Sequence, residues 1–274
     1  MLKVLVLGRS FTGRYLKSHF PAEVAFLGRN ESSLPSNFEP DLILDTVPAV
    51  HGEDGLLNPL YRDQWMRFAY TPFVHVSSTS VYPMPSVGVL EVDENSVPGN
   101  TERCRARLHV EEAVLKVRPD ALIVRSGGLY GPGRSLPWMI AEGRSRFFER
   151  GNEIISRIHV HDLCRIILEA AKLMAAGNAY FPGFERDLLI NGVDPEPSSV
   201  RETRDHLVEF FHRSDVREAI RSRGLNPPES LPDIADTSSQ RLVRSLYTSQ
   251  FGPFDYPDYR AGFLDSVLRT EASE

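Results

Sequence analysis

Cysteine is scarce in this chain of 274 residues, which holds only Cys104 and Cys164. Two cysteines supply neither a framework of several disulfides nor a four-cysteine metal site, and no other metal-ligand spacing is present. Basic residues are not in excess either, because the formal net charge is -6. A nucleic-acid-binding domain is usually basic, so we expect no nucleic-acid partner.

Long apolar runs and a signal peptide are also lacking, which predicts a cytoplasmic protein with no membrane partner. The composition is that of an ordinary globular protein, with 41% hydrophobic and 25% charged residues. The length suffices for one large α/β domain or for one domain with a small lobe.

The first twenty residues carry the clearest pattern. Residues 2–7 form a short apolar run, typical of a strand buried on both faces, and a helical stretch follows and stops at Pro21. Between them lies a Gly-x-Ser-x-x-Gly turn, one residue away from the dinucleotide-binding fingerprint. We therefore predict a cofactor site at Gly8, Ser10, Phe11 and Gly13. The alternative is a tight strand-to-helix turn without a ligand.

Each residue of this turn has a separate expected role. Gly8 permits the sharp exit from the strand, and Gly13 lets the helix pack close to the sheet. The helix N-terminus offers unpaired N–H groups to a pyrophosphate. Ser10 replaces the glycine that brings the backbone to the phosphates, but its hydroxyl can still donate a hydrogen bond.

The next strands extend the predicted cofactor site. Residues 23–27 read as a second strand that ends at Gly28, and Arg29 and Asn30 then lie where a dinucleotide fold meets the adenosine ribose. An arginine at that place favours a 2′-phosphate, so we expect NADP, with NAD as the alternative. A solvated arginine in a turn is the other reading. Residues 41–48 form the next strand and its exit, which brings Thr46, Val47 and Pro48 past the cofactor.

Strands and helices continue to alternate, with a helix expected over residues 56–70 and a strand over residues 73–77. This order predicts a Rossmann-type, doubly wound parallel sheet. From Gly177 the chain becomes rich in proline. We therefore expect a dinucleotide-binding domain over residues 1–176 and a small substrate-binding lobe over residues 177–274, with loops from residues 127–157 contributing. An amphipathic helix is expected over residues 200–211, and Asp162 is the expected N-cap of a helix that runs to residue 171.

Five segments, taken together, resemble the extended short-chain dehydrogenases/reductases, the NAD-dependent epimerase/dehydratase family. The segments are residues 76–82 (VSSTSVY), 124–134 (VRSGGLYGPGR), 157–163 (RIHVHDL), 180–194 together with 198–200, and 256–260 (YPDYR). They occur in the family's order and span nearly the whole chain. The resemblance implies a nicotinamide cofactor, with Ser77 beside it, and a small sugar-like or nucleotide-sugar substrate. A homodimer remains open.

The same resemblance implies a catalytic serine, tyrosine and lysine. Ser78 matches the serine, but Arg103 stands in the tyrosine position and Arg107 in the lysine position. Arginine stays protonated in proteins and cannot act as a general base. Arg103 is therefore expected to orient a phosphate or polarise a carbonyl. The other reading is a solvated helix face on which Arg103, Arg107 and Glu111 pair with one another. Chains of this kind resemble the atypical branch of the family.

Another residue would then have to move the proton, and Tyr82 is the first candidate, with Tyr130 the second. Four arginines near the glycine-rich loop would suit the diphosphate of a nucleotide sugar if they converge: Arg134, Arg144, Arg146 and Arg157. The sequence thus predicts an NADP-dependent oxidoreductase or epimerase-like enzyme. The alternative is a sensor or regulatory protein that binds the cofactor and catalyses no reaction.

Overall fold

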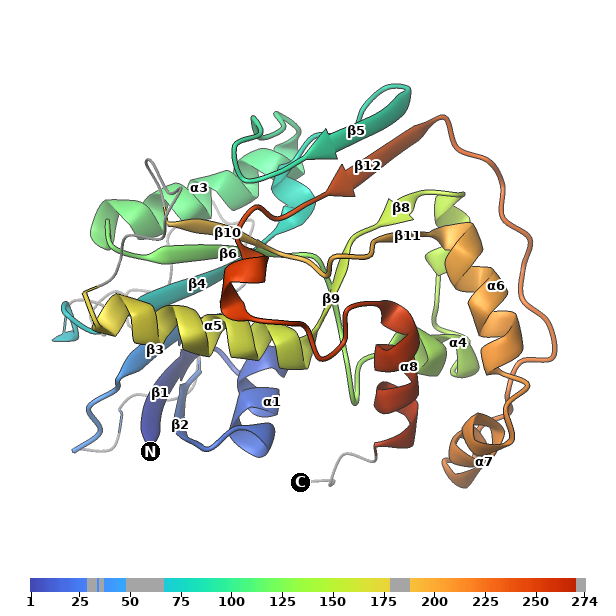
Figure 1. Cartoon of the computed structure of the whole chain (residues 1–274), viewed down its shortest axis with the longest axis horizontal. Helices are drawn as coiled ribbons and strands as arrows, with labels where there is room; N and C mark the ends of the chain where they lie inside the picture. Colours follow the sequence, from blue (N-terminus) through green and yellow to red (C-terminus); the bar gives the residue numbers. More distant parts are fainter. Residues whose placement is uncertain (29–33, 35–36, 48–66, 178–187, 270–274) are drawn as a thin grey trace.

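A six-stranded parallel sheet runs through the middle of the molecule, in the order β10-β6-β4-β3-β1-β2 (Figure 1). The computed structural model of the chain describes residues 1–28, 34, 37–47, 67–177 and 188–269. The strands of this sheet are β1 (Leu2–Leu7), β2 (Ala22–Leu27), β3 (Leu42–Asp45), β4 (Phe73–Ser78), β6 (Leu122–Ser126) and β10 (Leu189–Gly192). The predicted doubly wound α/β architecture is confirmed.

Three short strand pairs lie outside the main sheet. The parallel pairs are β5 (Gly88–Val92) with β12 (Ser239–Val243) and β7 (Gly128–Tyr130) with β9 (Arg157–His159). The antiparallel pair is β8 (Ile154–Ile155) with β11 (Ser198–Ser199). The β5–β12 pair joins segments that are far apart in the sequence, and neither was predicted as part of such a pair.

Helices cover both faces of the sheet (Figure 1). The helices are α1 (Phe11–His19), α3 (Glu102–Val117), α4 (Leu136–Ala141), α5 (Val160–Ala175), α6 (Val200–Phe210), α7 (Ser214–Ser222) and α8 (Tyr259–Leu268). Short 3-10 turns add η1 (Thr79–Val81), η2 (Phe147–Arg150) and η3 (Thr248–Phe251). Most of the helix expected over residues 56–70 lies outside the described residues. None of the described helices is both long and apolar enough to cross a bilayer.

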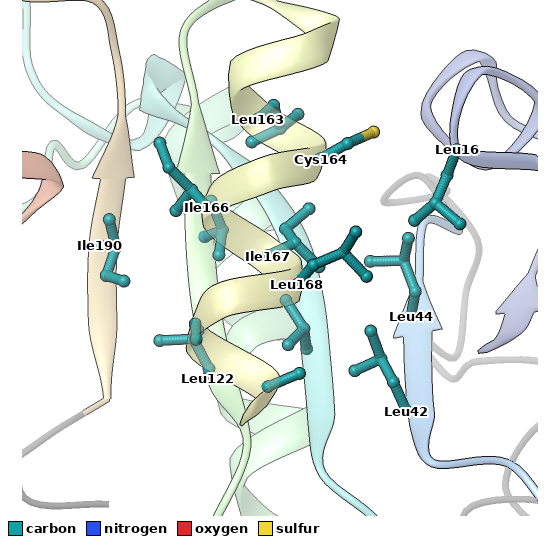
Figure 2. Close-up of a cluster of buried hydrophobic side chains, with 14 of the residues drawn as sticks. Leu16, Leu42, Leu44, Leu122, Leu163, Cys164, Ile166, Ile167, Leu168 and Ile190 are labelled. Carbon is teal, nitrogen blue, oxygen red and sulfur yellow. The ribbon is translucent and has the colours of Figure 1, made fainter. Parts of the chain in front are cut away.

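Alternate residues of the strands build two separate layers of core. Val4 and Val6 of β1 face one layer, together with α1 and α5, and Leu5 and Leu7 face the other, together with α3. All four side chains are fully buried, so the strand is covered on both faces as its apolar run predicts. Figure 2 shows the first layer, in which α5 lays Leu163, Ile166 and Ile167 against the sheet.

The N-terminus of α5 differs from the prediction. The helix begins one residue after His159, which is its N-cap and accepts a hydrogen bond from the backbone N–H of His161 through Nδ1 at 3.2 Å. Asp162, the predicted cap, lies inside the first turn and is fully buried. Its carboxylate instead accepts hydrogen bonds from the backbone N–H groups of Asp255 and Tyr256, each at 2.9 Å. Asp162 therefore fixes the loop before α8.

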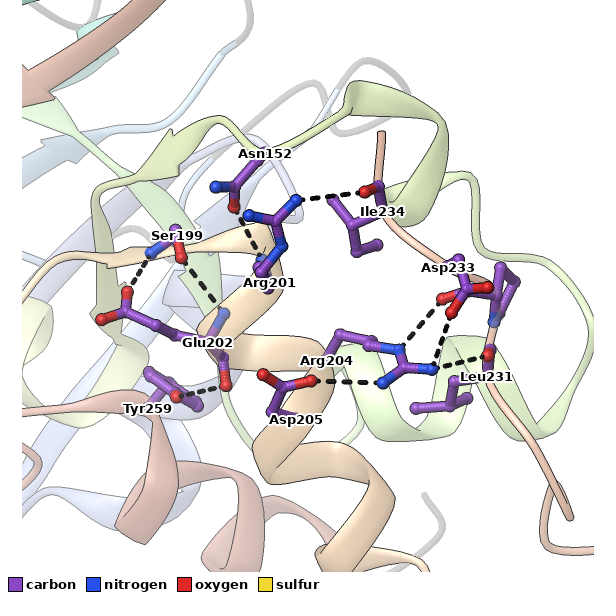
Figure 3. Close-up of polar contacts among 11 residues, drawn as sticks. Asn152, Ser199, Arg201, Glu202, Arg204, Asp205, Leu231, Asp233, Ile234 and Tyr259 are labelled. Atoms are coloured by element: carbon purple, nitrogen blue, oxygen red, sulfur yellow. Dashed lines mark hydrogen bonds and ion pairs between the residues drawn. The ribbon is translucent and has the colours of Figure 1, made fainter. Parts of the chain in front are cut away.

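A third hydrophobic cluster lies beside the sheet and joins α4, α6, α7 and α8. Trp138, Phe211 and Phe263 are among its buried side chains. Helix α6 begins with a capping box, in which Ser199 and Glu202 each accept a hydrogen bond from the other's backbone N–H (Figure 3). Arg204 of the same helix holds the segment around Asp233 at 3.2 Å.

The chain after residue 177 contributes to two parts of the molecule. It returns to the main sheet as β10, which pairs with β6, and only then enters the helical cluster with α6. The division into a cofactor domain and a substrate lobe stays a prediction. The structure adds that the last third of the chain supplies both the edge of the sheet and the helices beside it.

Candidate functional site

The turn between β1 and α1 has the backbone that its sequence suggested. Gly8 has a φ of 87°, a conformation that favours glycine. A Cβ on Gly13 would lie 2.7 Å from Cγ1 of Val6 and 2.9 Å from Cε1 of Phe26, so the absence of a side chain lets α1 lie directly on the sheet. Ser10 is the N-cap of α1, and its Oγ accepts a hydrogen bond from the backbone N–H of Gly13 at 3.1 Å. Its O–H remains able to donate.

The first turn of α1 keeps backbone donors for an anion. Gly13 and Arg14 donate their N–H groups to the Ser10 side chain and carbonyl, whereas no intramolecular acceptor meets those of Phe11 and Thr12 in the described part of the chain. Thr46 lies beside this turn, since a Cβ on Gly8 would be 3.4 Å from Thr46 Oγ1. The turn and the residues Thr46 and Val47 therefore meet where the strand order reverses, between β1 and β3, which is where open α/β sheets bind ligands.

These features fit the pyrophosphate of a dinucleotide: a glycine turn, free N–H groups and a hydroxyl donor at one helix N-terminus. Thr46 itself is oriented by the sheet, because its Oγ1 donates to the Leu7 carbonyl at 2.8 Å. Three of the predicted cofactor contacts, Arg29, Asn30 and Pro48, lie outside the described residues.

A polar cleft of about 530 Å³ opens at the carboxyl end of β4. Ser77 and Ser78 line it, as does Arg103 of α3, so two predicted catalytic residues share one cavity. Ser78 caps η1, and its Oγ accepts from the Ser80 N–H at 3.2 Å and donates to Ser80 Oγ at 3.1 Å. The hydroxyls of Ser78 and Ser80 are thus hydrogen-bonded to each other, and both residues line the cleft.

A second, more apolar cavity of about 650 Å³ adjoins the cleft. Both cavities are lined by Gly128, Leu129, Arg134, Arg150 and Ile155, so they share a wall. The guanidinium of Arg134 also lies 5.9 Å from the ring centroid of Phe11, the first residue of α1. Arg134 therefore touches the cofactor turn and both cavities.

Arginines dominate these two cavities. Arg103, Arg107, Arg134, Arg150 and Arg241 line the polar cleft, and no aspartate or glutamate among the described residues does. Of the four arginines expected to converge, three line the apolar cavity, namely Arg134, Arg146 and Arg157, and the fourth, Arg144, is exposed and paired with Glu142.

The alternative reading of α3, a solvated face with arginine–glutamate pairs, is wrong for Glu111. Glu111 points into the core, where its Oε2 lies 2.7 Å from Nη2 of Arg125 and its Oε1 accepts a hydrogen bond from the Ser77 hydroxyl. Glu111 therefore leaves Arg103 and Arg107 without a carboxylate partner in the part of the chain that the structure describes. Partial burial, together with the charge of Arg103, lowers the pKa of the Arg107 guanidinium.

Tyr82 is not placed to transfer a proton in the cleft. Its side chain is only 1% exposed, and its hydroxyl donates to Asn191 Oδ1 at 2.9 Å and accepts from Arg125 Nη1 at 3.0 Å. Burial raises the pKa of the Tyr82 phenol despite the nearby guanidinium. Tyr82 thus links η1 to β6 and β10 as part of the buried network around Glu111.

Tyr130 lines the apolar cavity and is not placed to act as a general base. Its hydroxyl donates to the Asp258 carbonyl at 3.1 Å, and burial raises the pKa of the phenol well above its usual value. Serine, threonine and arginine supply the polar side chains of the polar cleft, so none of the described side chains lining it is a general base at neutral pH. Within the described ranges, no cluster of histidine, cysteine and acidic side chains is placed to hold a metal ion.

Two arginines of the cleft, Arg150 and Arg241, were not among the predicted site residues. Arg241 belongs to β12 and is held by a hydrogen bond from its Nη1 to the Tyr82 carbonyl at 2.6 Å. Arg150 ends η2 and pairs with Glu153 at 2.6 Å. Both arginines reach the cleft through long-range packing of β12 and η2.

No protein-family model matches the sequence, and no significant relative is found among curated proteins. Solved structures are similar over nearly the full length. A human epimerase family protein, SDR39U1, solved with NADPH, is 18% identical with a TM-score of 0.62, covering 97% of this chain and 99% of its own. UDP-glucuronic acid 4-epimerase from Bacillus cereus, solved with NAD, is 16% identical with a TM-score of 0.63, covering 97% and 96%.

A third solved structure is MoeE5 in complex with UDP-glucose and NAD, which is 18% identical with a TM-score of 0.61 and covers 97% of both chains. At these identities the similarity is one of fold. The chain therefore has the fold of proteins crystallised with nicotinamide dinucleotides, and its β1–α1 turn and two cavities lie within that fold.

Proposed function

We propose that the protein is an NADP-dependent oxidoreductase or epimerase-like enzyme of the atypical short-chain type, acting on a nucleotide-sugar substrate. One observation carries the proposal. Arg134 lies over Phe11 at the dinucleotide turn and lines both cavities, so a cofactor, a reacting group and a nucleotide would meet around one side chain. The solved structures with NADPH, NAD and UDP-glucose support the same combination of ligands.

The β1–α1 turn would hold the pyrophosphate with Gly8, Ser10, Phe11 and Gly13. The rest of the dinucleotide would contact Arg29 and Asn30 at the ribose, and Thr46, Val47, Pro48 and Ser77 along the sheet edge. A bound reduced nicotinamide supplies the hydride for a carbonyl carbon of the substrate.

Ser78 would hydrogen-bond the reacting oxygen from the polar cleft. In the structure the Ser78 O–H donates to Ser80 Oγ, so for Ser78 to give its proton to the substrate oxygen this bond would reverse, with Ser80 donating to Ser78 and taking a proton from water in the cleft. Arg103 would stabilise negative charge on that oxygen as a permanent cation. This arrangement needs no phenolate, which agrees with the buried position of Tyr82.

The apolar cavity suits a nucleoside diphosphate. Leu136, Met139 and Phe147 offer apolar contacts to a base and ribose, whereas Arg146 and Arg157 offer donors to phosphates. Arg157 is fixed in place by Ser198 Oγ at 2.6 Å and Thr203 Oγ1 at 3.0 Å.

A cofactor-binding sensor is the second candidate, and it is favoured because no described side chain on the wall of the polar cleft can serve as a general base. A titration followed by a turnover assay separates the two functions. We expect NADPH to bind more tightly than NADH, and Arg29→Asp to remove that preference while NADH binding persists.

NADPH oxidation is then followed by absorbance with a panel of keto-sugar nucleotides, in the unmodified protein and in Ser78→Ala. Oxidation that depends on Ser78 supports the enzyme. Tight NADPH binding with no oxidation across the panel supports the sensor, and no binding of either coenzyme refutes both.

A further inference from the structure

Arg103 and Arg107 lie one turn apart on α3 and both line the polar cleft. Among the described residues, neither has a hydrogen-bond or ion-pair partner. Nε of Arg107 is buried and has no acceptor there. Two guanidinium groups therefore face one cavity without an acceptor from the described part of the chain.

Of the other cations of the cleft, two have polar partners and the third, Arg134, has an aromatic one. Arg150 pairs with Glu153, Arg241 donates to the Tyr82 carbonyl, and Arg134 lies over the ring of Phe11. These three side chains each have a contact within the protein that holds or balances the guanidinium.

The acid that could have neutralised this face of α3 is Glu111, one turn beyond Arg107. It is committed to Arg125 and to the Ser77 hydroxyl instead. Arg103 and Arg107 are thus two neighbouring cleft arginines without a polar side-chain partner among the described residues, although the charge of Glu111 still acts on Arg107.

Such an arrangement is unfavourable in the absence of a ligand. Like charges at i and i+4 repel each other, and a partly buried guanidinium loses hydration that no described acceptor replaces. An oxyanion placed between the two groups would relieve both costs, because carboxylates and phosphates accept paired hydrogen bonds from guanidinium. Serine hydroxyls of the same cleft, Ser78 and Ser80, supply further donors.

We propose that Arg103 and Arg107 form an anion subsite beside Ser78. This subsite selects substrates in which the sugar, the part of the molecule that reacts, carries a negatively charged group. The group is a carboxylate or a phosphate, additional to the diphosphate of the nucleotide. The inference rests on the proposed function and narrows its substrate class from nucleotide sugars in general to sugar acids or sugar phosphates.

Matched ligand pairs test the subsite. UDP-glucuronate and UDP-glucose differ only in a carboxylate, and glucose 6-phosphate and glucose differ only in a phosphate. Calorimetry on the NADP-loaded protein should show that the anionic member of at least one pair binds about tenfold tighter, the gain typical of one charge-assisted hydrogen bond. The pair that shows the gain identifies the anionic group.

Variants assign the gain to the two arginines. In the double variant Arg103→Gln and Arg107→Gln, the preference should fall below about threefold, and Arg107→Lys should retain part of it because charge without the planar fork binds less well. Arg105→Gln is the control, because Arg105 is exposed on the same helix and does not line either cavity. Melting curves check that all variants are folded.

Equal affinities within both pairs, or a preference that survives the double variant, would overturn the subsite. A failure of the proposed function would give a different binding result. If UDP itself does not bind, the nucleotide-sugar assignment is lost, and the glucose pair alone still decides whether α3 selects an anion.

Discussion

Gly13 occupies a position at which even a methyl group has no room. A Cβ there would lie 2.7 Å from an atom of Val6 and 2.9 Å from an atom of Phe26, and both side chains are held in the sheet. This contact sets how closely α1 approaches the sheet, and so where the first N–H groups of the helix lie. A single side chain at residue 13 would move the predicted phosphate site.

We expect Gly13→Ala to lower the free energy of unfolding by about 1–3 kcal/mol, because extra volume in a packed contact forces neighbouring atoms to shift. Urea denaturation measures the change. Gly128→Ala is the control, since its Cβ would meet nothing closer than 3.5 Å, and it should change stability by less than about 0.5 kcal/mol. Equal effects of the two variants would refute the packing argument.

Glu111 is the residue whose role is least apparent from its local sequence. It lies in a helix of mixed charges, yet it is only 5% exposed and pairs with Arg125. Glu111→Gln leaves a buried guanidinium without its counter-ion and should cost about 3–5 kcal/mol.

Thermal or urea unfolding of Glu111→Gln beside Glu112→Gln tests this role. Glu112 is exposed on the same helix, so its variant should stay within about 0.5 kcal/mol of the unmodified protein. A loss of less than about 1 kcal/mol for Glu111→Gln would mean that the pair contributes little to stability.

At the scale of the element, N-cap residues determine where the helices around the candidate site begin. Ser10 caps α1 at the cofactor turn, Ser78 caps η1 at the cleft, and Thr101 caps α3, whose arginines line the same cleft. Each cap satisfies a backbone N–H that would otherwise face solvent or a ligand. The caps thus fix where each functional element begins.

The capping box of α6 permits a direct test of this contribution (Figure 3). Ser199→Ala removes the acceptor of the Glu202 N–H and should lower stability by about 1 kcal/mol. Ser222, the last residue of α7, serves as the control. Ser222→Ala removes only a hydrogen bond to the Ala219 carbonyl and should change stability by less than about 0.5 kcal/mol. Chemical denaturation compares the two variants, and a reversed order would contradict the cap assignment.

At the scale of the whole molecule, one buried histidine links folding to pH. His159 is fully buried between β9 and α5, and burial, with smaller effects of nearby cations, lowers its pKa to about 3. Asp265 Oδ2 lies 3.6 Å from Nε2, and neither atom has a hydrogen-bond partner among the described residues. The folded state therefore keeps the imidazole neutral, with Nδ1 as the acceptor that caps α5.

Because the unfolded chain binds this proton near pH 6.5 and the folded chain only near pH 3, the contribution of His159 to stability is complete above pH 6.5 and decreases as the pH falls. The decrease reaches about 1.4 kcal/mol per pH unit in that window. His159→Asn retains a cap acceptor without titrating, so its stability should fall less steeply between about pH 6.5 and 4.5. Parallel slopes in urea titrations would exclude His159 as the group responsible.

Features that depend on neighbouring residues are easier to predict from this sequence than features that depend on contacts between distant segments. The strand at residues 2–7, the glycine turn and the helix expected over residues 200–211 are read from neighbouring residues, and the structure has all three, with the helix at Val200–Phe210. The predicted cofactor residues Gly8, Ser10 and Thr46 lie close together because parallel strands bring their carboxyl ends to one edge of the sheet.

What could not be predicted depends on contacts between distant segments. Helical spacing puts Glu111 beside Arg107, but the ion pair with Arg125 is decided by a strand that packs behind α3. Tyr82 follows a strand end, a typical place for a catalytic group, yet Asn191 of β10 removes its hydroxyl from the cleft. Asp162 was the expected cap of α5, but its carboxylate accepts from the loop at residues 255 and 256, and His159 caps the helix instead.

The parallel ribbon of β5 and β12 has a consequence for synthesis. Residues 88–92 pair with residues 239–243, so β5 has no partner until almost the entire polypeptide has left the ribosome. Until then the exposed Val87 and Val89 lie beside open backbone donors and acceptors, a combination prone to intermolecular association. Chains that terminate before residue 239 should consequently aggregate, even though every strand of the main sheet is already present.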